Sequence, residues 1–176
     1  VIGQDQSGFT GQLYFDGNAF SSNSGSFNNT APTSSVVTIN TDSTVNQSTK
    51  TYVMYCFANV EGYSAVGSYT GNGSTDGPYA YLGFRPAFIM LKRSNDSGGW
   101  QMLDNKRNTF NAVDRYLSAN GNHVEIDGST LSPSINVDFL SNGFKLRTTE
   151  AVYNSSGGTF LYLAFAEQPF KFSNAR

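Results

Sequence analysis

The chain has 176 residues, which is enough for one domain with a hydrophobic core, and a net charge of −2. Charged residues make up 14% of it, well below the roughly 25% of an average globular protein, and aromatic residues make up another 14%, so the composition argues against disorder and for short strands joined by tight turns. The scattered Lys and Arg residues argue against a nucleic-acid partner, and no stretch approaches the ~20 consecutive apolar residues of a membrane helix.

The N-terminal residues predict a short strand followed by a long polar arm. Residues 8–15 read GFTGQLYF, a strand candidate, and residues 16–35 are dominated by Gly, Ser, Asn and Thr, which is typical of a linker or an extended arm. A second short strand is expected at residues 36–39. We therefore divide the chain into an N-terminal strand and arm at residues 1–35, interpreted as an assembly segment, and a β-sandwich domain at residues 36–176.

The next stretch predicts three strands and one polar loop. Residues 52–58 are apolar on both faces, which is typical of a strand that is covered on both sides. Residues 63–70 and 88–91 are two further strand candidates, and residues 71–78 form a polar loop between them. The single cysteine, Cys56, excludes an internal disulfide and is expected to be a small buried hydrophobic side chain within its strand.

A hairpin is the clearest local pattern of the C-terminal half. Residues 135–140 alternate apolar and polar side chains, Asn142-Gly143 supplies turn residues that tolerate φ > 0, and the apolar face returns at Phe144 and Leu146. The last strong strand is predicted at residues 159–166, with apolar side chains on both faces. Other short strands are expected at 100–103 and 124–126, with irregular chain at 104–122.

About ten short strands at spacings of ~8–15 residues predict an all-β fold, an antiparallel β-sandwich of the jelly-roll or concanavalin-like kind. Several motifs then resemble a known domain: YCFANVEGYSAVGSYTGNGSTDGP, GFRPAFIMLKRS, DNKR, DFLSNGFKLRT and LAFAEQPFKFSNAR. They are similar to a C-terminal domain of phage tail-fibre and related virion structural proteins, found mainly in marine and environmental phages. The resemblance covers residues 51–176. It implies a concanavalin-like or laminin-G-like sandwich on an extracellular particle, and it carries over no catalytic residue.

Sugar binding needs an exposed aromatic face with amide and carboxylate partners around it. Candidates for such a site lie in and around the polar loop at residues 71–78, and one more follows a glycine-rich turn. The alternative is that Trp100 and most tyrosines only pack in or around the core. The candidate residues are Tyr69, Asn72, Asp76, Tyr79 and Trp100.

Catalytic and metal sites have little support in the sequence. His123 is the only imidazole and stands next to a turn, so a Ser–His–Asp triad is not indicated. Glu125 and Asp127 alternate like the carboxylates of a sandwich glycosidase, but no second glutamate follows at the required position. Asp76, or Asp104 with Asn105, has oxygen atoms for calcium, yet no calcium-loop motif occurs, so we predict neither a cofactor nor a metal.

Assembly is the remaining use for the N-terminal strand. Residues 1–15 cannot bury their apolar side chains alone, so they pair either with their own sandwich or with the sheet edge of another subunit. The residues expected to carry this contact are Phe9, Leu13, Tyr14 and Phe15.

Together these patterns predict a non-enzymatic structural subunit of a virion tail fibre that binds a cell-surface glycan, expected as a homotrimer. The alternative is a repeating subunit of an extracellular filament, joined head to tail by N-terminal strand exchange. A glycosidase on a concanavalin-like sandwich is the third hypothesis. No membrane insertion is expected.

Overall fold

Six antiparallel strands form the larger sheet of the computed structural model, which describes residues 10–15 and 19–168. Across this sheet the strand order is β3-β11-β5-β6-β7-β8, so β11, the last strand among the described residues, pairs with both β3 and β5. The strands are β3 (Ser64–Thr70), β11 (Thr159–Ala166), β5 (Pro86–Arg93), β6 (Gln101–Asp104), β7 (Arg115–Ser118) and β8 (Ile126–Asp127).

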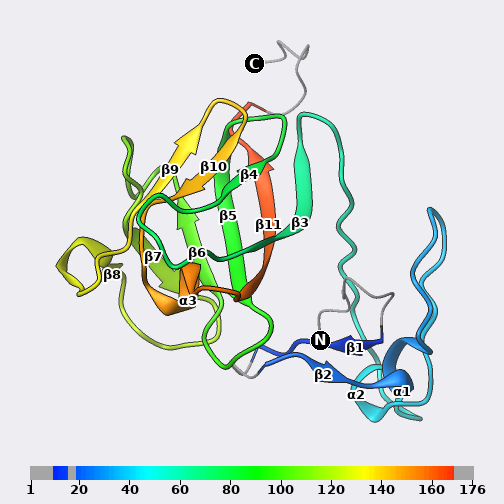
Figure 1. Ribbon diagram of the computed structural model, residues 1–176. Coiled ribbons are helices and arrows are strands. Elements are labelled where there is room, and N and C mark those ends of the chain that lie inside the picture. The colour runs from blue at the N-terminus through cyan, green and yellow to red at the C-terminus, as the bar shows by residue number, and fades with distance from the viewer. Residues whose placement is uncertain (1–9, 16–18, 169–176) are drawn as a thin grey trace.

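A smaller antiparallel sheet packs on one face of the larger one (Figure 1). Its strand order is β4-β10-β9. The two sheets confirm the predicted all-β antiparallel sandwich. The strands of the smaller sheet are β4 (Tyr79–Tyr81), β10 (Gly143–Leu146) and β9 (Val137–Leu140).

Most of the described chain before β3 lies outside the two sheets, at one end of the sandwich and along its β3 edge (Figure 1). It holds a two-stranded sheet and two single-turn helices, and the first strand of the sandwich is β3. No helix among the described residues is long and apolar enough to cross a bilayer. The remaining elements are β1 (Gly11–Gln12), β2 (Ser21–Ser22), α1 (Ser24–Phe27), α2 (Ser43–Asn46), the 3-10 helix η1 (Gly128–Thr130) and α3 (Ala151–Asn154).

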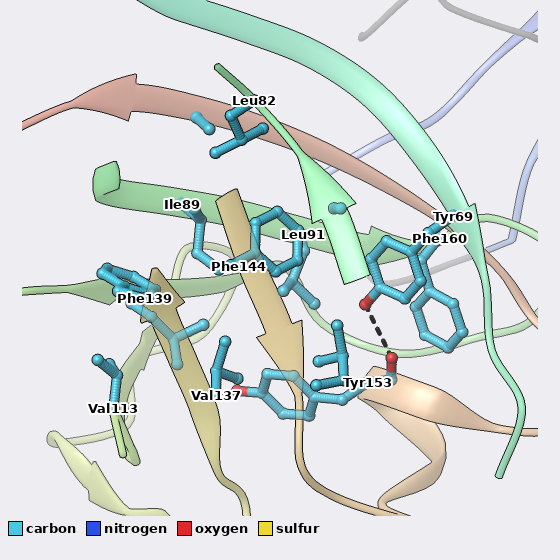
Figure 2. Close-up of a cluster of buried hydrophobic side chains, with 14 of the residues drawn as sticks. Tyr69, Leu82, Ile89, Leu91, Val113, Val137, Phe139, Phe144, Tyr153 and Phe160 are labelled. Atoms are coloured by element: carbon cyan, nitrogen blue, oxygen red, sulfur yellow. Dashed lines mark hydrogen bonds between the residues drawn. The ribbon is translucent and has the colours of Figure 1, made fainter. Parts of the chain in front are cut away.

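The hydrophobic core lies between the two sheets and is rich in aromatic rings (Figure 2). Tyr69 of β3 stacks on Phe160 of β11 with ring centroids 5.0 Å apart and an interplanar angle of 7°. Phe144 of β10 meets Tyr69 edge-on, with centroids 6.0 Å apart. Offset and edge-on aromatic pairs contribute about 0.5–1.5 kcal/mol each beyond the area they bury. Because side chains alternate between the two faces of each strand, the inward-facing positions place several large rings between the sheets.

Several predicted strands are confirmed, among them those at 63–70, 88–91 and 159–166. The hairpin is confirmed too, but its turn differs by one residue. Gly143 pairs with Leu140, so Ser141 and Asn142 form the two-residue loop and Gly143 begins β10. The glycine is needed because the backbone of β4 comes close, and an added Cβ would lie 2.1 Å from the carbonyl oxygen of Ala80.

Two predicted strands are wrong. Residues 36–39 and residues 52–58 form no strand, and Cys56 is exposed instead of buried. A β-bridge between Val60 and Ser64 reverses the chain just before β3. Oδ1 of Asn59 also accepts a hydrogen bond from the backbone N–H of Val66 at 2.6 Å. Residues 52–58 therefore do not continue the ladder along β3.

The irregular chain predicted at 104–122 contains one strand that the sequence did not indicate. Residues 115–118 form β7, which pairs with β6 and aligns Tyr116 with Leu103. The strand was not predicted because asparagines on either side indicate a loop. The apolar residues also fit a helical spacing as well as a short strand. The brief strand expected at 124–126 is found two residues later, as β8.

Candidate functional site

A buried asparagine, Asn154, holds the polar loop at residues 71–78 in place. Its Nδ2 donates to the carbonyl oxygens of Ser74 and Thr148, each at 2.8 Å, and to Oδ1 of Asn72 at 3.0 Å. Its Oδ1 accepts a hydrogen bond from the backbone N–H of Asn72 at 2.9 Å. A side-chain amide both donates and accepts, so one residue satisfies the backbone at several points of the loop. Asn72, a predicted sugar-binding residue, is used to fix the shape of the loop.

Asp76 stands exposed at the tip of this loop, between two cations. Lys145 Nζ lies 2.8 Å from its Oδ1, and Arg147 Nη1 lies 3.4 Å away. Lys145 also donates to the carbonyl oxygen of Gly77 at 2.9 Å, and Arg147 Nε lies 2.8 Å from Oδ2 of Asp138. The hydrogen bond from Lys145, followed by the charge of that residue, lowers the pKa of Asp76. The loop tip thus carries a fixed set of charged groups next to β10.

Two tyrosines, one on each side of Ala80 in the sequence, lie on the outer face of β4. Ala80 is buried between them, whereas Tyr79 is 40% exposed and Tyr81 is 68% exposed. The hydroxyl group of Tyr79 donates to Oδ1 of Asn142 at 2.7 Å, and an added Cβ at Gly143 would meet the Tyr79 ring. Tyr79 was predicted as a site residue and Tyr81 was not. The alternation Tyr-Ala-Tyr was the signal that places both rings on one face.

A shallow hollow of about 330 Å³ adjoins Tyr81 where the two sheets open beside β3. Tyr162 contributes a second ring to it, and Asn59 and Glu61 contribute polar side chains. We call the surface made by these two strand tyrosines and the charged loop tip the tyrosine face. It consists of Asp76, Tyr79, Tyr81, Lys145 and Arg147.

Two of the three rings predicted to bind sugar are not on the surface. Tyr69 is buried, stacks on Phe160, and donates its hydroxyl hydrogen to the carbonyl oxygen of Tyr153 at 2.8 Å, while burial raises its pKa well above the ordinary value. Trp100 is only 3% exposed, and its Nε1 donates to the carbonyl oxygen of Tyr14 at 2.9 Å. Both residues therefore pack within the fold, as the alternative to sugar binding expected.

The described part of the predicted assembly strand lies against its own sandwich. Leu13 is fully buried in a cluster with Trp100 and Leu161, on the face of the larger sheet that the smaller sheet does not cover. The ring of Phe15 lies 5.0 Å from that of Trp100. Phe9 lies outside the described residues. Within these residues the strand folds back on its own domain, which was the alternative to exchange with a neighbour.

The carboxylates considered for a glycosidase are both engaged by guanidinium groups. Arg107 Nη1 lies 2.8 Å from Oε2 of Glu125, and Arg115 lies 3.4 Å from both Glu125 and Asp127. A hydrogen bond from the Ser129 hydroxyl group is the main cause that lowers the pKa of Asp127. The general acid of a glycosidase needs a raised pKa instead. This arrangement fixes the ends of β7 and β8.

The remaining polar candidates also have structural partners. Asp104 is paired with Arg107 at 2.8 Å, and Asn105 is buried with its Nδ2 donating to Oε1 of Glu167 at 2.8 Å. His123 is exposed in the loop before β8. Across the described residues, no three His, Cys, Asp or Glu side chains are grouped as ligands of one metal ion.

The comparisons with known proteins give one family. The model of a family described as "Domain of unknown function (DUF7483)" matches residues 5–169, so the chain belongs to this family. No curated protein and no solved structure matches the chain significantly.

Proposed function

We propose that this member of the DUF7483 family is a non-enzymatic structural subunit of fibre type on a virion or another extracellular particle, and that its tyrosine face binds a cell-surface glycan. The observation that supports recognition is the pair of exposed rings, Tyr79 and Tyr81, beside the loop held by Asn154. The surface rich in hydroxyl and amide groups agrees with an extracellular particle.

The tyrosine face has the groups that a sugar requires. The apolar face of a sugar ring stacks on an exposed aromatic ring, and the hydroxyl groups of the sugar need donors and acceptors at the edge of that ring. Tyr81 offers the more exposed ring, and Asp76, Lys145 and Arg147 offer both kinds of polar group. Because the loop and the strand are already ordered, binding would lose little conformational entropy.

Glycan binding by single variants tests this proposal. The wild-type protein is screened on a glycan array, and the affinity for the best ligand is then measured by calorimetry. We expect Tyr81→Ala to weaken binding at least about tenfold, which corresponds to ~1.4 kcal/mol, and Tyr79→Ala to weaken it less. Phe110→Ala is the matched control, because Phe110 is an exposed ring outside the tyrosine face. A wild-type protein that binds no glycan, or a Tyr81→Ala variant that binds like the wild type, would contradict the site.

The alternative role, a repeating filament subunit, needs a surface that joins copies of the chain. Residues 10–15 do not offer one in this conformation, because Leu13 is already buried against Trp100. A different segment has the required exposure, and it supports self-association independently of glycan binding.

A further inference from the structure

Residues 51–57, which we call the apolar segment, are exposed although all of their side chains except that of Thr51 are apolar or aromatic. Val53 is 78% exposed, Tyr55 is 81% exposed and Phe57 is 56% exposed. The segment contains no charged residue, no glycine and no proline. None of the hydrogen bonds between described residues involves a backbone group of this segment. An extended stretch with these properties marks an interaction site, since water solvates it poorly and it readily pairs with other protein surfaces.

Both ends of the apolar segment are held in place. At its N-terminal end, Tyr52 donates its hydroxyl hydrogen to the carbonyl oxygen of Ser43 at 2.7 Å and accepts the backbone N–H of Gln47 at 2.9 Å. At its C-terminal end, the bridge between Val60 and Ser64 turns the chain into β3. The segment therefore spans the distance between α2 and the edge of the larger sheet, as the extended trace beside β3 shows (Figure 1).

A second apolar surface crosses the outer face of the larger sheet. Strand pairing aligns one side chain from each of five neighbouring strands: Val66 with Leu163, Leu163 with Met90, Met90 with Met102, and Met102 with Leu117. We call these five residues the apolar row. Their neighbours along each strand point into the core, so the row faces away from the smaller sheet. All five side chains are half-buried, and none is charged.

The apolar row is bordered on both sides by contacts within the chain, and its central residue, Met90, packs against one of these borders. On one side, Leu13 packs against Trp100. On the other side, Phe165 lies 6.3 Å from Phe88 and 5.8 Å from Phe57, measured between ring centroids. Phe57, the last residue of the apolar segment, thus already lies against the border of this face. The exposed segment and the half-buried row are both apolar.

The apolar segment cannot cover its own row. The row extends from β3 to β7, which is four steps between neighbouring strands and roughly 19 Å. The segment is held at the β3 edge of the sheet and at α2, so its central residues do not reach Met102 and Leu117 on the same chain. We propose that the apolar segment of one chain docks on the apolar row of a second copy.

The area agrees with a specific but modest contact. An aromatic side chain buries roughly 150–250 Å², so the exposed parts of the apolar segment amount to roughly 500 Å². The half-buried row offers less area than the segment, so the contact removes at most roughly 1,000 Å² from water, which is near the lower limit for a specific interface. Neither surface carries a charge that would have to be desolvated.

The docking mode also limits the kind of assembly. The segment and the row are different surfaces, so each chain donates to one neighbour and accepts from another. Such head-to-tail contacts either close into a ring, as in a trimer, or continue as a filament. Fibre subunits would meet through these two surfaces whether or not the tyrosine face binds a glycan.

Cross-linking between two differently tagged chains tests the proposal, because Cys56 of the apolar segment is the only cysteine and is exposed. One chain is the wild type, and the other carries Cys56→Ser together with Met102→Cys. The two are co-expressed and treated with a short bis-maleimide. We expect a cross-linked heterodimer of both tags. The matched control replaces Met102→Cys by Thr75→Cys, which places the thiol on the exposed polar loop, and its yield should be at least about tenfold lower.

Three results would overturn the proposal. The first is equal cross-linking to the row and to the control position. The second is a chain carrying both Cys56 and Met102→Cys that closes only within itself, since this would place the segment on its own row. The third is a wild-type protein that sediments as a monomer at every concentration. Glycan binding by the monomer would still support the proposed recognition role, so the two proposals fail separately.

Discussion

Two stretches of this chain have nearly the same sequence pattern, but one forms a buried strand and the other is exposed and forms no strand. Residues 159–166 read TFLYLAFA, and residues 51–58 read TYVMYCFA. The first stretch is β11, paired on both sides by β3 and β5, with Phe160 and Ala164 fully buried. The second is not a strand, and Val53 and Tyr55 are largely exposed.

The difference lies in the partners that each stretch finds. β11 enters a sheet in which an antiparallel neighbour lies on each side. The apolar segment precedes β3 but is separated from its ladder by the Val60–Ser64 bridge. A stretch with apolar side chains on both faces therefore indicates that both faces are buried against other protein surfaces. The pattern does not indicate whether these surfaces belong to the same chain, and we propose that here they belong to a second copy.

The largest expected effect comes from matched phenylalanine substitutions in the two stretches. Phe160→Ala removes a fully buried ring stacked on Tyr69, and we expect it to lower the free energy of unfolding by about 3–5 kcal/mol. Phe57→Ala removes a ring that is 56% exposed, and we expect a loss below about 1 kcal/mol in the monomer. Urea denaturation at low protein concentration measures both. Equal losses would show that the two stretches are equally buried in solution.

A smaller loss in the free energy of unfolding is expected from a substitution at Asn154, where the loop of the tyrosine face joins the sandwich. Asn154→Ala leaves the buried carbonyl group of Thr148 and the carbonyl group of Ser74 without their donor, so we expect a loss of about 1–3 kcal/mol and faster amide exchange in residues 71–78. Asn122→Ala is the exposed control. Unchanged exchange in the loop of the Asn154→Ala variant would refute the role of Asn154 as its anchor.

A still smaller effect depends on pH and involves Asp76. The folded state lowers the pKa of Asp76 below its ordinary value of 3.8, so the ionised carboxylate stabilises the fold above that pH. This contribution disappears as the pH falls through the folded-state pKa. We expect Asp76→Asn to lower Tm slightly at neutral pH and to match the wild type well below pH 3.8. A difference in Tm that persists in acid would rule out this ion pair as its cause.

The smallest effect on stability is expected in the apolar segment itself. Val53→Thr exchanges an exposed methyl group for a hydroxyl group, and we expect the free energy of unfolding of the monomer to change by less than about 0.5 kcal/mol. Chemical denaturation of dilute protein is the measurement. A loss above about 1 kcal/mol would mean that Val53 is buried within its own chain.

Much of the sandwich could be predicted because its strands carry their own signals. The alternation around Val137 and Phe139, the turn before Gly143 and the apolar run of β11 indicate strands from local sequence alone. The strand β7 was missed because it is short, places only Tyr116 in the core, and lies within asparagine-rich chain. The stretch at 52–58 was misjudged for the opposite reason: its pattern is strong, but the topology gives it no neighbour.

The candidate site was predictable in position more than in detail. The loop at 71–78 and Tyr79 follow from a polar stretch next to aromatic residues. The burial of Tyr69 and Trp100 depends on contacts with Phe160 and with the N-terminal strand, which are distant in sequence. Asn154 looks like any loop asparagine until its long-range hydrogen bonds are seen.

Sedimentation velocity over a concentration series tests most directly the claim that a second copy covers the apolar segment. The protein is compared as wild type, as Tyr55→Ser in the segment, as Met102→Lys in the apolar row, and as Phe110→Ala, an exposed ring outside both surfaces. We predict that the wild type and Phe110→Ala associate into trimers or larger species as concentration rises, whereas the other two variants remain folded monomers. Association of the Tyr55→Ser and Met102→Lys variants at wild-type strength, or a wild type that never associates, would contradict the account.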